Sequence, residues 1–303
     1  MPEFYNVGIR TMGPVLALSS NSPFLPPDVY EDDVEPYELL DETYHELRIP
    51  VFEQAVNPSE KYDEKKVRVP RDLEETEDVV DRVAADMTYS PLVREWVDES
   101  ETEESYIDRF WEFDYKRGTY WRWLRAVIGG SPVGDANDER SVRIEYRPIP
   151  TQPTVRDNIA ILALTTGLLI GLVNENHPVV ELGWEDAKES FYNAVHDGFD
   201  AELRWVDAEG NRTTDSGVIF DEIFEYATKG LEEQGFSEQA VEKYIAPIRR
   251  RYEAGTTPSV WKIERVRERL GDGEEFEDSV HGMQRDYIRR QRQNEGSFAD
   301  WLQ

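Results

Sequence analysis

The chain has 303 residues, of which 39% are hydrophobic and 12% aromatic, enough apolar material for one large domain or two ordinary ones. Its 64 acidic and 34 basic residues give a formal net charge of −30, which excludes a broad nucleic-acid-binding face. The charge favours adaptation to a salty cytoplasm over an acidic partner surface, because molar salt shortens the Debye length to about 3 Å and screens the self-repulsion. The absence of cysteine excludes disulfides and thiolate metal sites.

The first predicted elements alternate helix, loop and strand. Apolar residues recur every three or four positions over residues 3–19, which predicts a helix that ends at the proline-rich stretch after it. Residues 29–42 are predicted to be an acidic loop or surface helix. Alternating apolar residues predict short strands at 46–52 and 65–70.

The middle of the chain carries the strongest patterns. An amphipathic helix with an aspartate cap is predicted over residues 72–87, and residues 91–117 are predicted to be mostly helical. A strand is expected at 141–147. Thr154 then caps an apolar helix over 155–173, which we expect to be the most buried helix and to pack against the sheet.

Neither a membrane-spanning helix nor a signal peptide is expected from the sequence. The apolar run at 158–173 falls short of the roughly 18–20 residues that a membrane span needs. The N-terminal residues lack the basic region and apolar core of a signal peptide. The sequence therefore predicts a soluble cytoplasmic protein with no membrane or nucleic-acid partner.

The remaining sequence is predicted to be mainly helical, with one hairpin at 201–214 and a frayed tail at 294–303. The helices are expected near residues 184–197, 217–234, 237–252 and 258–293. Many helices around few strands predict an α+β fold with an incomplete antiparallel sheet and a large helical C-terminal part. We expect one domain over 1–303, made of a sheet-associated region (1–175), a helical extension (176–293) and the tail.

The segment SVRIEYR at 141–147 is a candidate anion and metal site. Strand alternation places Arg143, Glu145 and Arg147 on one face. Such a face can hold a divalent cation through the carboxylate and polyphosphate oxygens through the arginines. The spacing alone favours the alternative, a solvated edge strand whose charges pair with one another.

The segment GTYWRWLR at 118–125 sets arginines between aromatic rings. Taken by itself, it too favours a plain interpretation, with Trp121 and Trp123 as packing residues and Arg122 and Arg125 as surface charges. Clustered arginines are nevertheless unexpected in so acidic a chain, because they repel one another unless an anion lies between them.

Together the two segments resemble a known family. The order G-T-x-W-R-W-x-R, a glycine-containing loop, then R-I-E-x-R-x-x-P-x-x-P-T-V-x-D resembles the carboxylate–amine ligases of glutamate–cysteine ligase family 2, of haloarchaeal type. Upstream, MGPVLALSSNSPF at 12–24 is similar to that family's helix ending in ALSANSPF. The resemblance is clear over residues 5–175 and fainter to about residue 290. It implies a glutamine-synthetase-like catalytic fold whose concave sheet face holds ATP, Mg²⁺ or Mn²⁺, and glutamate.

The resemblance also implies a reaction and a set of site residues. The γ-carboxylate of glutamate would become an acyl phosphate, which an amine such as cysteine then attacks, as in γ-glutamylcysteine and glutathione biosynthesis. Glu145 matches the family's metal-binding strand glutamate. The implied catalytic residues are Arg122, Arg125 and Arg147, and the implied substrate or nucleotide contacts are Arg48, Trp121, Trp123 and Arg143.

One departure from the family pattern leaves three hypotheses open. The family's N-terminal strands, with their glutamate cluster and H-x-H motif, have no counterpart in this sequence, whose four histidines are scattered. The chain is therefore interpreted as the C-terminal portion of a ligase domain. It is an ATP-dependent ligase, or a non-catalytic remnant or subunit that needs a complementary N-terminal part or a homo-oligomeric partner, or an acidic helical interaction module.

Overall fold

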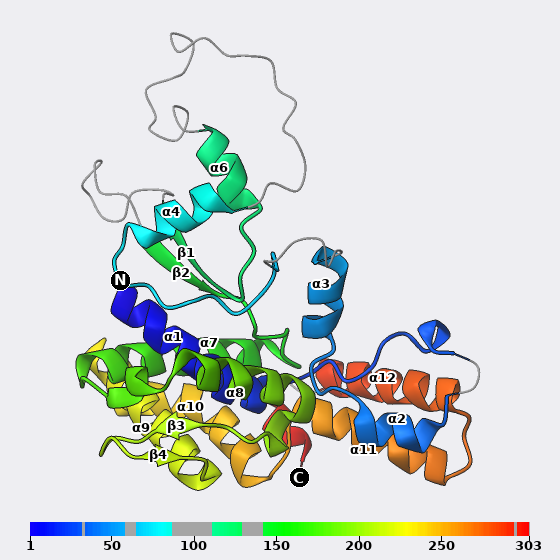
Figure 1. Cartoon of the computed structure of the whole chain (residues 1–303). Helices are drawn as coiled ribbons and strands as arrows, with labels where there is room; N and C mark the ends of the chain where they lie inside the picture. Colours follow the sequence, from blue (N-terminus) through cyan, green and yellow to red (C-terminus); the bar gives the residue numbers. More distant parts are fainter. Residues whose placement is uncertain (32–33, 58–64, 87–110, 129–141, 294–295, 303) are drawn as a thin grey trace. The chain divides into compact units, whose positions relative to one another are not determined.

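The computed structural model (Figure 1) describes residues 1–31, 34–57, 65–86, 111–128, 142–293 and 296–302. The chain divides into two compact units. Unit 1 comprises Met1–Asn6 and Phe52–Arg147, and unit 2 comprises Val7–Val51 and Pro148–Gln303. The division falls within helix α1 (Pro2–Ser19), which confirms the first predicted helix, and within α3 (Arg48–Val56). The single-domain prediction over residues 1–303 stays a prediction.

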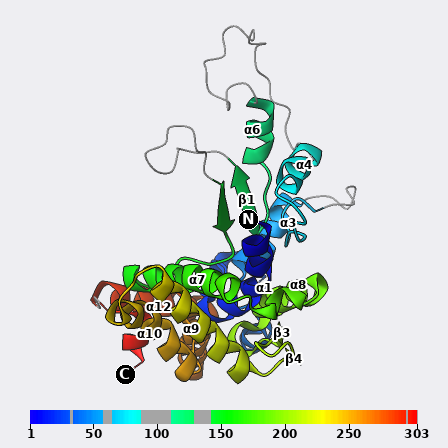
Figure 2. The ribbon, with the colours of Figure 1, turned by 90° about the vertical axis from the view of Figure 1, so that its left-hand side faces the viewer.

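Unit 1 contains the antiparallel hairpin of β1 (Leu124–Ile128) and β2 (Val142–Tyr146), drawn as neighbouring arrows in Figure 2. The strand predicted at 141–147 is thereby confirmed. Two helices of the same unit, α4 (Asp78–Ala85) and α6 (Trp111–Gly118), contact each other. Leu124 is fully buried in this unit, and its carbonyl accepts a hydrogen bond of 3.1 Å from the Tyr5 hydroxyl.

The strand predicted at 46–52 is wrong, because α3 occupies this stretch. Apolar residues at Ile49, Phe52 and Val56 fit one helix face as well as strand alternation, and Pro50 falls in the first turn, where its missing N–H costs nothing.

The strand predicted at 65–70 is also wrong, since this stretch forms no ladder in the described part of the chain. The Asn57 side chain satisfies both backbone groups of Val67, at 2.9 Å from its N–H and 2.8 Å from its carbonyl. An amide side chain thus replaces the partner strand that alternation implied.

The helix predicted over 72–87 begins six residues later than expected, at Asp78. The Asp78 carboxylate accepts the backbone N–H groups of Glu74 and Glu75 at 2.7 and 3.1 Å, which folds the preceding residues into a turn. Of the helix predicted over 91–117, α6 is present, and the part before residue 111 lies outside the described residues.

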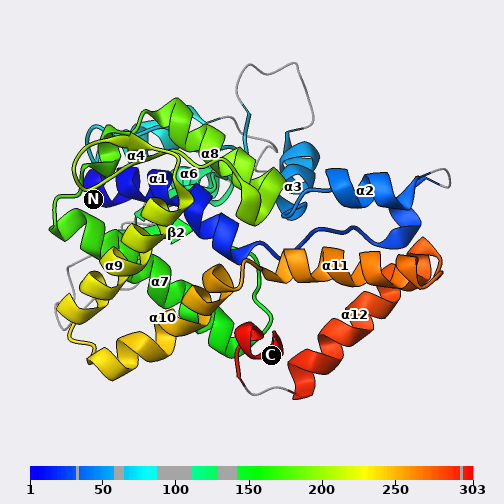
Figure 3. The same cartoon turned by 90° about the horizontal axis from the view of Figure 1, so that it is seen from below.

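Unit 2 is built mainly from helices (Figure 3). Its central helix α7 (Val155–Asn174) is capped as predicted, since the Thr154 hydroxyl accepts the Asp157 N–H at 3.1 Å. Its packing partners within this unit are two helices, α9 (Ser216–Glu233) and α10 (Glu238–Glu253). Packing of α7 against the sheet of β1 and β2 stays a prediction.

Glycines let α7 and α9 approach closely within unit 2. A Cβ atom added to Gly171 would lie 2.0 Å from the Tyr226 carbonyl oxygen, and one added to Gly230 would lie 2.0 Å from that of Gly167. The absence of side chains therefore lets the two backbones meet directly. By length and composition alone α7 could span a membrane, which corrects the expectation that this run is too short. However, 56% of its most apolar 18-residue stretch is buried, as in a core helix.

The other predicted helices and the hairpin of unit 2 are confirmed. The remaining elements are α2 (Pro36–Glu42), α8 (Trp184–Asp197), β3 (Trp205–Val206), β4 (Arg212–Thr213), α11 (Pro258–Gly271) and α12 (Phe276–Gln293). The strands β3 and β4 pair antiparallel, and α11 packs on α12.

The described part of the C-terminal tail, residues 296–302, is folded, which corrects the prediction of fraying for that part of 294–303. Residues Phe298–Trp301 form a 3₁₀ turn closed by a capping box of Ser297 and Asp300. Phe298 is fully buried and Trp301 is 6% exposed in a cluster with α11 and α12. The fold is α+β, helix-rich, with small antiparallel sheets in the described residues, as predicted.

Candidate functional site

The centre of the candidate site is the cross-strand pair of Arg125 and Glu145. The register of β1 and β2 sets these residues directly opposite each other, so their side chains share one face of the hairpin. The Arg125 Nη2 and Nε atoms lie 2.7 and 3.0 Å from the Glu145 Oε2 atom. Two charge-assisted hydrogen bonds therefore converge on one carboxylate oxygen.

Arg125 is held in place by the chain that precedes β1. Its Nη1 group donates to the carbonyl oxygens of Arg117 and Tyr120 at 3.0 and 3.3 Å. The Arg125 side chain is 14% exposed, and each of its three nitrogens makes a hydrogen bond. Arg125 thus orients the glutamate and has little freedom to turn toward a ligand.

Arg143 completes the charged face on the solvent side. Its Nη2 atom lies 3.4 Å from Glu145 Oε1, and its side chain is 51% exposed. The charged residues of β1 and β2 are Arg125, Arg143 and Glu145, which sum to +1 in a chain whose net charge is −30. A locally positive strand face in so negative a protein is suited to an anionic ligand.

Arg122 has a different, buried set of partners. The guanidinium donates to Asp86 Oδ1 at 2.9 Å and to the Lys66 carbonyl, and lies 4.2 Å above the Tyr120 ring. The Lys66 ammonium pairs with the same aspartate, and both basic side chains are almost fully buried. The contacts that hold Arg122 are therefore those of the unit 1 core, whereas Arg125 and Arg143 each contact Glu145.

The two tryptophans of the motif pack with neighbouring aromatic and acidic residues. Trp123 is 3% exposed, and its indole N–H donates to Glu53 Oε1 at 2.6 Å. The Phe52 ring centre lies 5.8 Å from that of Trp121 and 5.9 Å from that of Trp123. These contacts are those of packing residues, in line with the plain interpretation of the motif.

The last two predicted arginines lie outside the strands. Arg147 follows β2 directly, and its backbone N–H donates to the Trp123 carbonyl at 2.9 Å, which extends the hairpin by one residue. Arg48 belongs to unit 2, where it contacts the Pro148 carbonyl and lies 3.2 Å from Glu46 Oε1. Burial raises the pKa of Glu46, and Arg48 opposes that rise.

The described residues do not fit a magnesium site. Mg²⁺ in phosphoryl-transfer enzymes is held by one or two carboxylates together with substrate phosphates. Glu145 is the one carboxylate within the described strands β1 and β2, and both of its oxygens are engaged by arginines. Within the described ranges no group of three or more His, Cys, Asp or Glu residues could hold a metal ion. We therefore derive no step through a metal.

Sequence reasoning missed the partners that fix these arginines. Asp86 and Lys66 lie 36 and 56 residues before Arg122, so no local spacing could have linked them. Glu46 could have been recognised from the sequence as a partner of Arg48, because it stands two residues before it. A carboxylate so close to a predicted substrate arginine is a natural partner for it.

Comparison with known proteins agrees with the motif order. The family model described as glutamate-cysteine ligase family 2 matches residues 4–294, nearly the whole chain. No curated protein and no solved structure matches the sequence. The family match spans both the strand motifs of unit 1 and the helices of unit 2. The chain therefore belongs to glutamate–cysteine ligase family 2.

Proposed function

We propose that this protein carries out, or contributes residues to, the ATP-dependent joining of a carboxylate to an amine. The observation that carries the proposal is the family match over residues 4–294. The substrates are small molecules, with glutamate as the carboxylate and an amine such as cysteine as the acceptor. The γ-phosphoryl group of ATP passes to the γ-carboxylate oxygen, and the amine nitrogen then displaces phosphate from the acyl phosphate.

The positive face of the β1–β2 hairpin supports a role in this chemistry. Phosphoryl transfer depends mainly on positioning and electrostatic stabilisation, for which arginine forks are suited. In the proposal Arg143 and Arg147 contact phosphate or glutamate, while Arg125 holds Glu145 between them. Arg122 supports the strand from the core side through Asp86. A substrate contact of Arg48 is a separate proposal, confined to unit 2.

The need for a metal ion favours a second form of the proposal, in which residues 1–303 do not hold the metal by themselves. Both oxygens of Glu145 are engaged by arginines, and the described residues add no cluster that could hold catalytic Mg²⁺ or Mn²⁺. In this form of the proposal the carboxylates that hold the metal come from a partner subunit or from a complementary N-terminal part. In that case residues 1–303 bind the nucleotide but turn over slowly.

The experiment is to measure ADP release by the protein with ATP, Mg²⁺ or Mn²⁺, glutamate and cysteine, omitting each in turn. We expect release that requires glutamate and is slower than the roughly 1–10³ s⁻¹ of ordinary enzymes. Release at an ordinary rate would overturn the second form and reveal a metal site among residues not described. Absence of both nucleotide binding and glutamate-dependent release would overturn the ligase proposal.

The proposal includes the salt concentration at which the protein works. A chain of net charge −30 with few lysines is suited to a cytoplasm of high ionic strength. We propose that the protein works there, so the ADP assay is run at about molar KCl as well as at low salt.

A further inference from the structure

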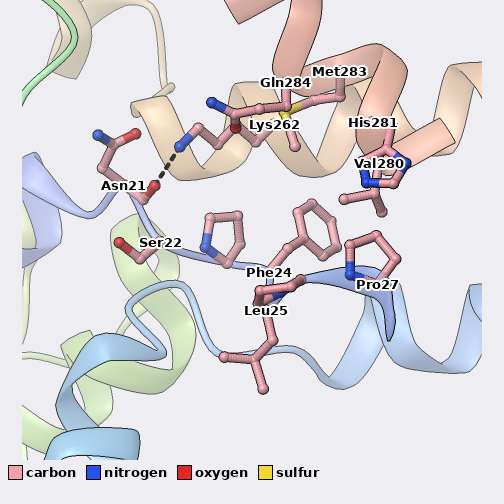
Figure 4. Close-up of a pocket in the computed structure, with 12 residues that line it drawn as sticks. Asn21, Ser22, Phe24, Leu25, Pro27, Lys262, Val280, His281, Met283 and Gln284 are labelled. Atoms are coloured by element: carbon pink, nitrogen blue, oxygen red, sulfur yellow. Dashed lines mark hydrogen bonds between the residues drawn. The ribbon is translucent and has the colours of Figure 1, made fainter. Parts of the chain in front are cut away.

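A second candidate site lies wholly within unit 2. A pocket of about 370 Å³ lies between the loop Asn21–Pro27 and helices α11 and α12 (Figure 4). This volume falls at the lower end of the range for small-molecule sites, about 300–1,000 Å³. It is separate from the arginine face of β1–β2, whose residues do not line it.

Most of the pocket wall is apolar. Phe24 and Leu25 come from the loop, and Val280 and Met283 come from α12. In Figure 4 the Phe24 ring lies close to Val280. Met283 is 2% exposed, so this wall belongs to the packed core and is not a loose surface dimple. An apolar wall of this kind receives the hydrocarbon part of a ligand.

The ammonium group of Lys262 lies at the end of the pocket nearest Asn21. The Lys262 Nζ atom donates to the Asn21 carbonyl at 2.7 Å, shown dashed in Figure 4, and lies 4.3 Å from the Tyr287 ring centre. Among the described residues the Asn21 carbonyl is the one hydrogen-bond acceptor of Lys262, so two of the three ammonium donors remain for a ligand. Burial lowers the pKa of Lys262 to about 8, against an opposing effect of Glu46.

We propose that this pocket binds a small monocarboxylate with an apolar tail. The carboxylate pairs with Lys262, and the tail lies against Phe24, Leu25 and Met283. A single ammonium with no arginine among the lining residues matches one negative charge and not a polyphosphate. The half-buried position of Lys262 also favours an anion, since pairing restores the charged form that loss of solvent disfavours. The inference does not depend on the ligase proposal.

Met283 offers a direct test, because the chain has only four methionines. Protein labelled with ¹³C at the methionine methyl groups is titrated with hexanoate, hexanamide and acetate, and the Met283 resonance is followed by NMR. Met12, which is fully buried in α1, is the internal control for the fold. We expect hexanoate to shift Met283 but not Met12, and to bind about tenfold or more tightly than hexanamide. Acetate, which lacks the tail, should bind more weakly than hexanoate.

Two variants separate a ligand site from a structural lysine. Lys262→Gln keeps a donor for the Asn21 carbonyl but removes the charge, and it should abolish the preference for hexanoate over hexanamide. Leu25→Trp fills the pocket and should remove the Met283 shift while Lys262 is intact. The proposal is overturned if hexanoate leaves Met283 unmoved in the wild type at tens of millimolar, if hexanamide binds equally well, or if Lys262→Gln retains the preference.

Discussion

Replacing Arg251 with methionine should destabilise the protein far more than the same change at the neighbouring Arg250. Both Arg251 and Asp157 have fully buried side chains, and Arg251 Nη2 lies 2.7 Å from Asp157 Oδ1 in an ion pair without hydrogen-bond geometry. Arg251 Nη1 also donates to Gln152 Oε1 at 2.6 Å. Burial lowers the pKa of Arg251, and Asp157 opposes this, so the aspartate keeps the guanidinium charged.

The expected magnitude follows from what Arg251→Met leaves behind. In the variant, Asp157 Oδ2 still accepts the Phe298 N–H at 2.9 Å. The Asp157 carboxylate is nevertheless left as a buried negative charge with no cation beside it. Breaking one side of a buried ion pair costs about 3–5 kcal/mol. Arg250 pairs with Asp300 at 2.7 Å, with side chains 37% and 31% exposed, and such pairs contribute only about 0–1 kcal/mol.

The assay is urea unfolding of the wild type, Arg251→Met and Arg250→Met at one pH and salt concentration, with thermal midpoints recorded in parallel. At about 2–4 °C per kcal/mol for a folding unit of this size, Arg251→Met should lower the midpoint by roughly 6–20 °C. Adding Asp157→Asn to Arg251→Met should recover part of the loss, because the unpaired charge disappears. Equal losses for the two arginine variants would refute the reasoning.

Three further predictions concern stability. Gly230→Ala should cost about 1–3 kcal/mol or more, because its Cβ would meet the backbone of α7 at 2.0 Å, whereas Gly271→Ala, with nothing within 4 Å, should be neutral or slightly stabilising in the same urea assay. The thermal midpoint should rise sharply from 0.1 M to about 1 M KCl because screening relieves the −30 charge, and a flat response would remove the salt-adaptation proposal. Burial lowers the pKa values of His45 and His177 in the folded protein. As the pH falls, these histidines therefore bind protons in the unfolded chain before they do so in the folded protein. The free energy of unfolding present above about pH 6.5 should then decrease as the pH falls. Unfolding free energies at about pH 7 and pH 5.5 should show this loss more strongly in the wild type than in His177→Gln, and a loss of equal size in both would contradict the assignment.

Local signals in the sequence predicted much of the fold. The alternation around Glu145 predicted β2, and the uninterrupted apolar run after Thr154 predicted α7 and its cap. These elements are specified by residues within a few positions of one another. The helices of unit 2 follow the same rule, since their apolar periodicity lies entirely within each helix.

Contacts between distant residues could not be predicted. The strand assignment at 65–70 failed because a single side chain, Asn57, takes the place of a partner strand. The order of the tail could not be predicted either, because the aspartate that binds the Phe298 N–H lies 141 residues away. At the site, the strand pattern brought Arg143 near Glu145 on one face, but it could not show that Arg122 faces Asp86.

The most direct test of the account is ATP binding by the arginine face, measured by calorimetry with Mg²⁺ present. Arg143→Ala and Arg147→Ala should each weaken binding by about tenfold or more, the scale of losing one hydrogen bond to a charged group, and Arg147→Lys should restore little because it lacks the planar fork. Arg212→Ala is the matched control, since Arg212 is an exposed strand arginine paired with Asp186 at 2.8 Å on the other hairpin. The account predicts that the control binds ATP like the wild type. Undiminished binding in both Arg143→Ala and Arg147→Ala, or no ATP binding by the wild type, would contradict it.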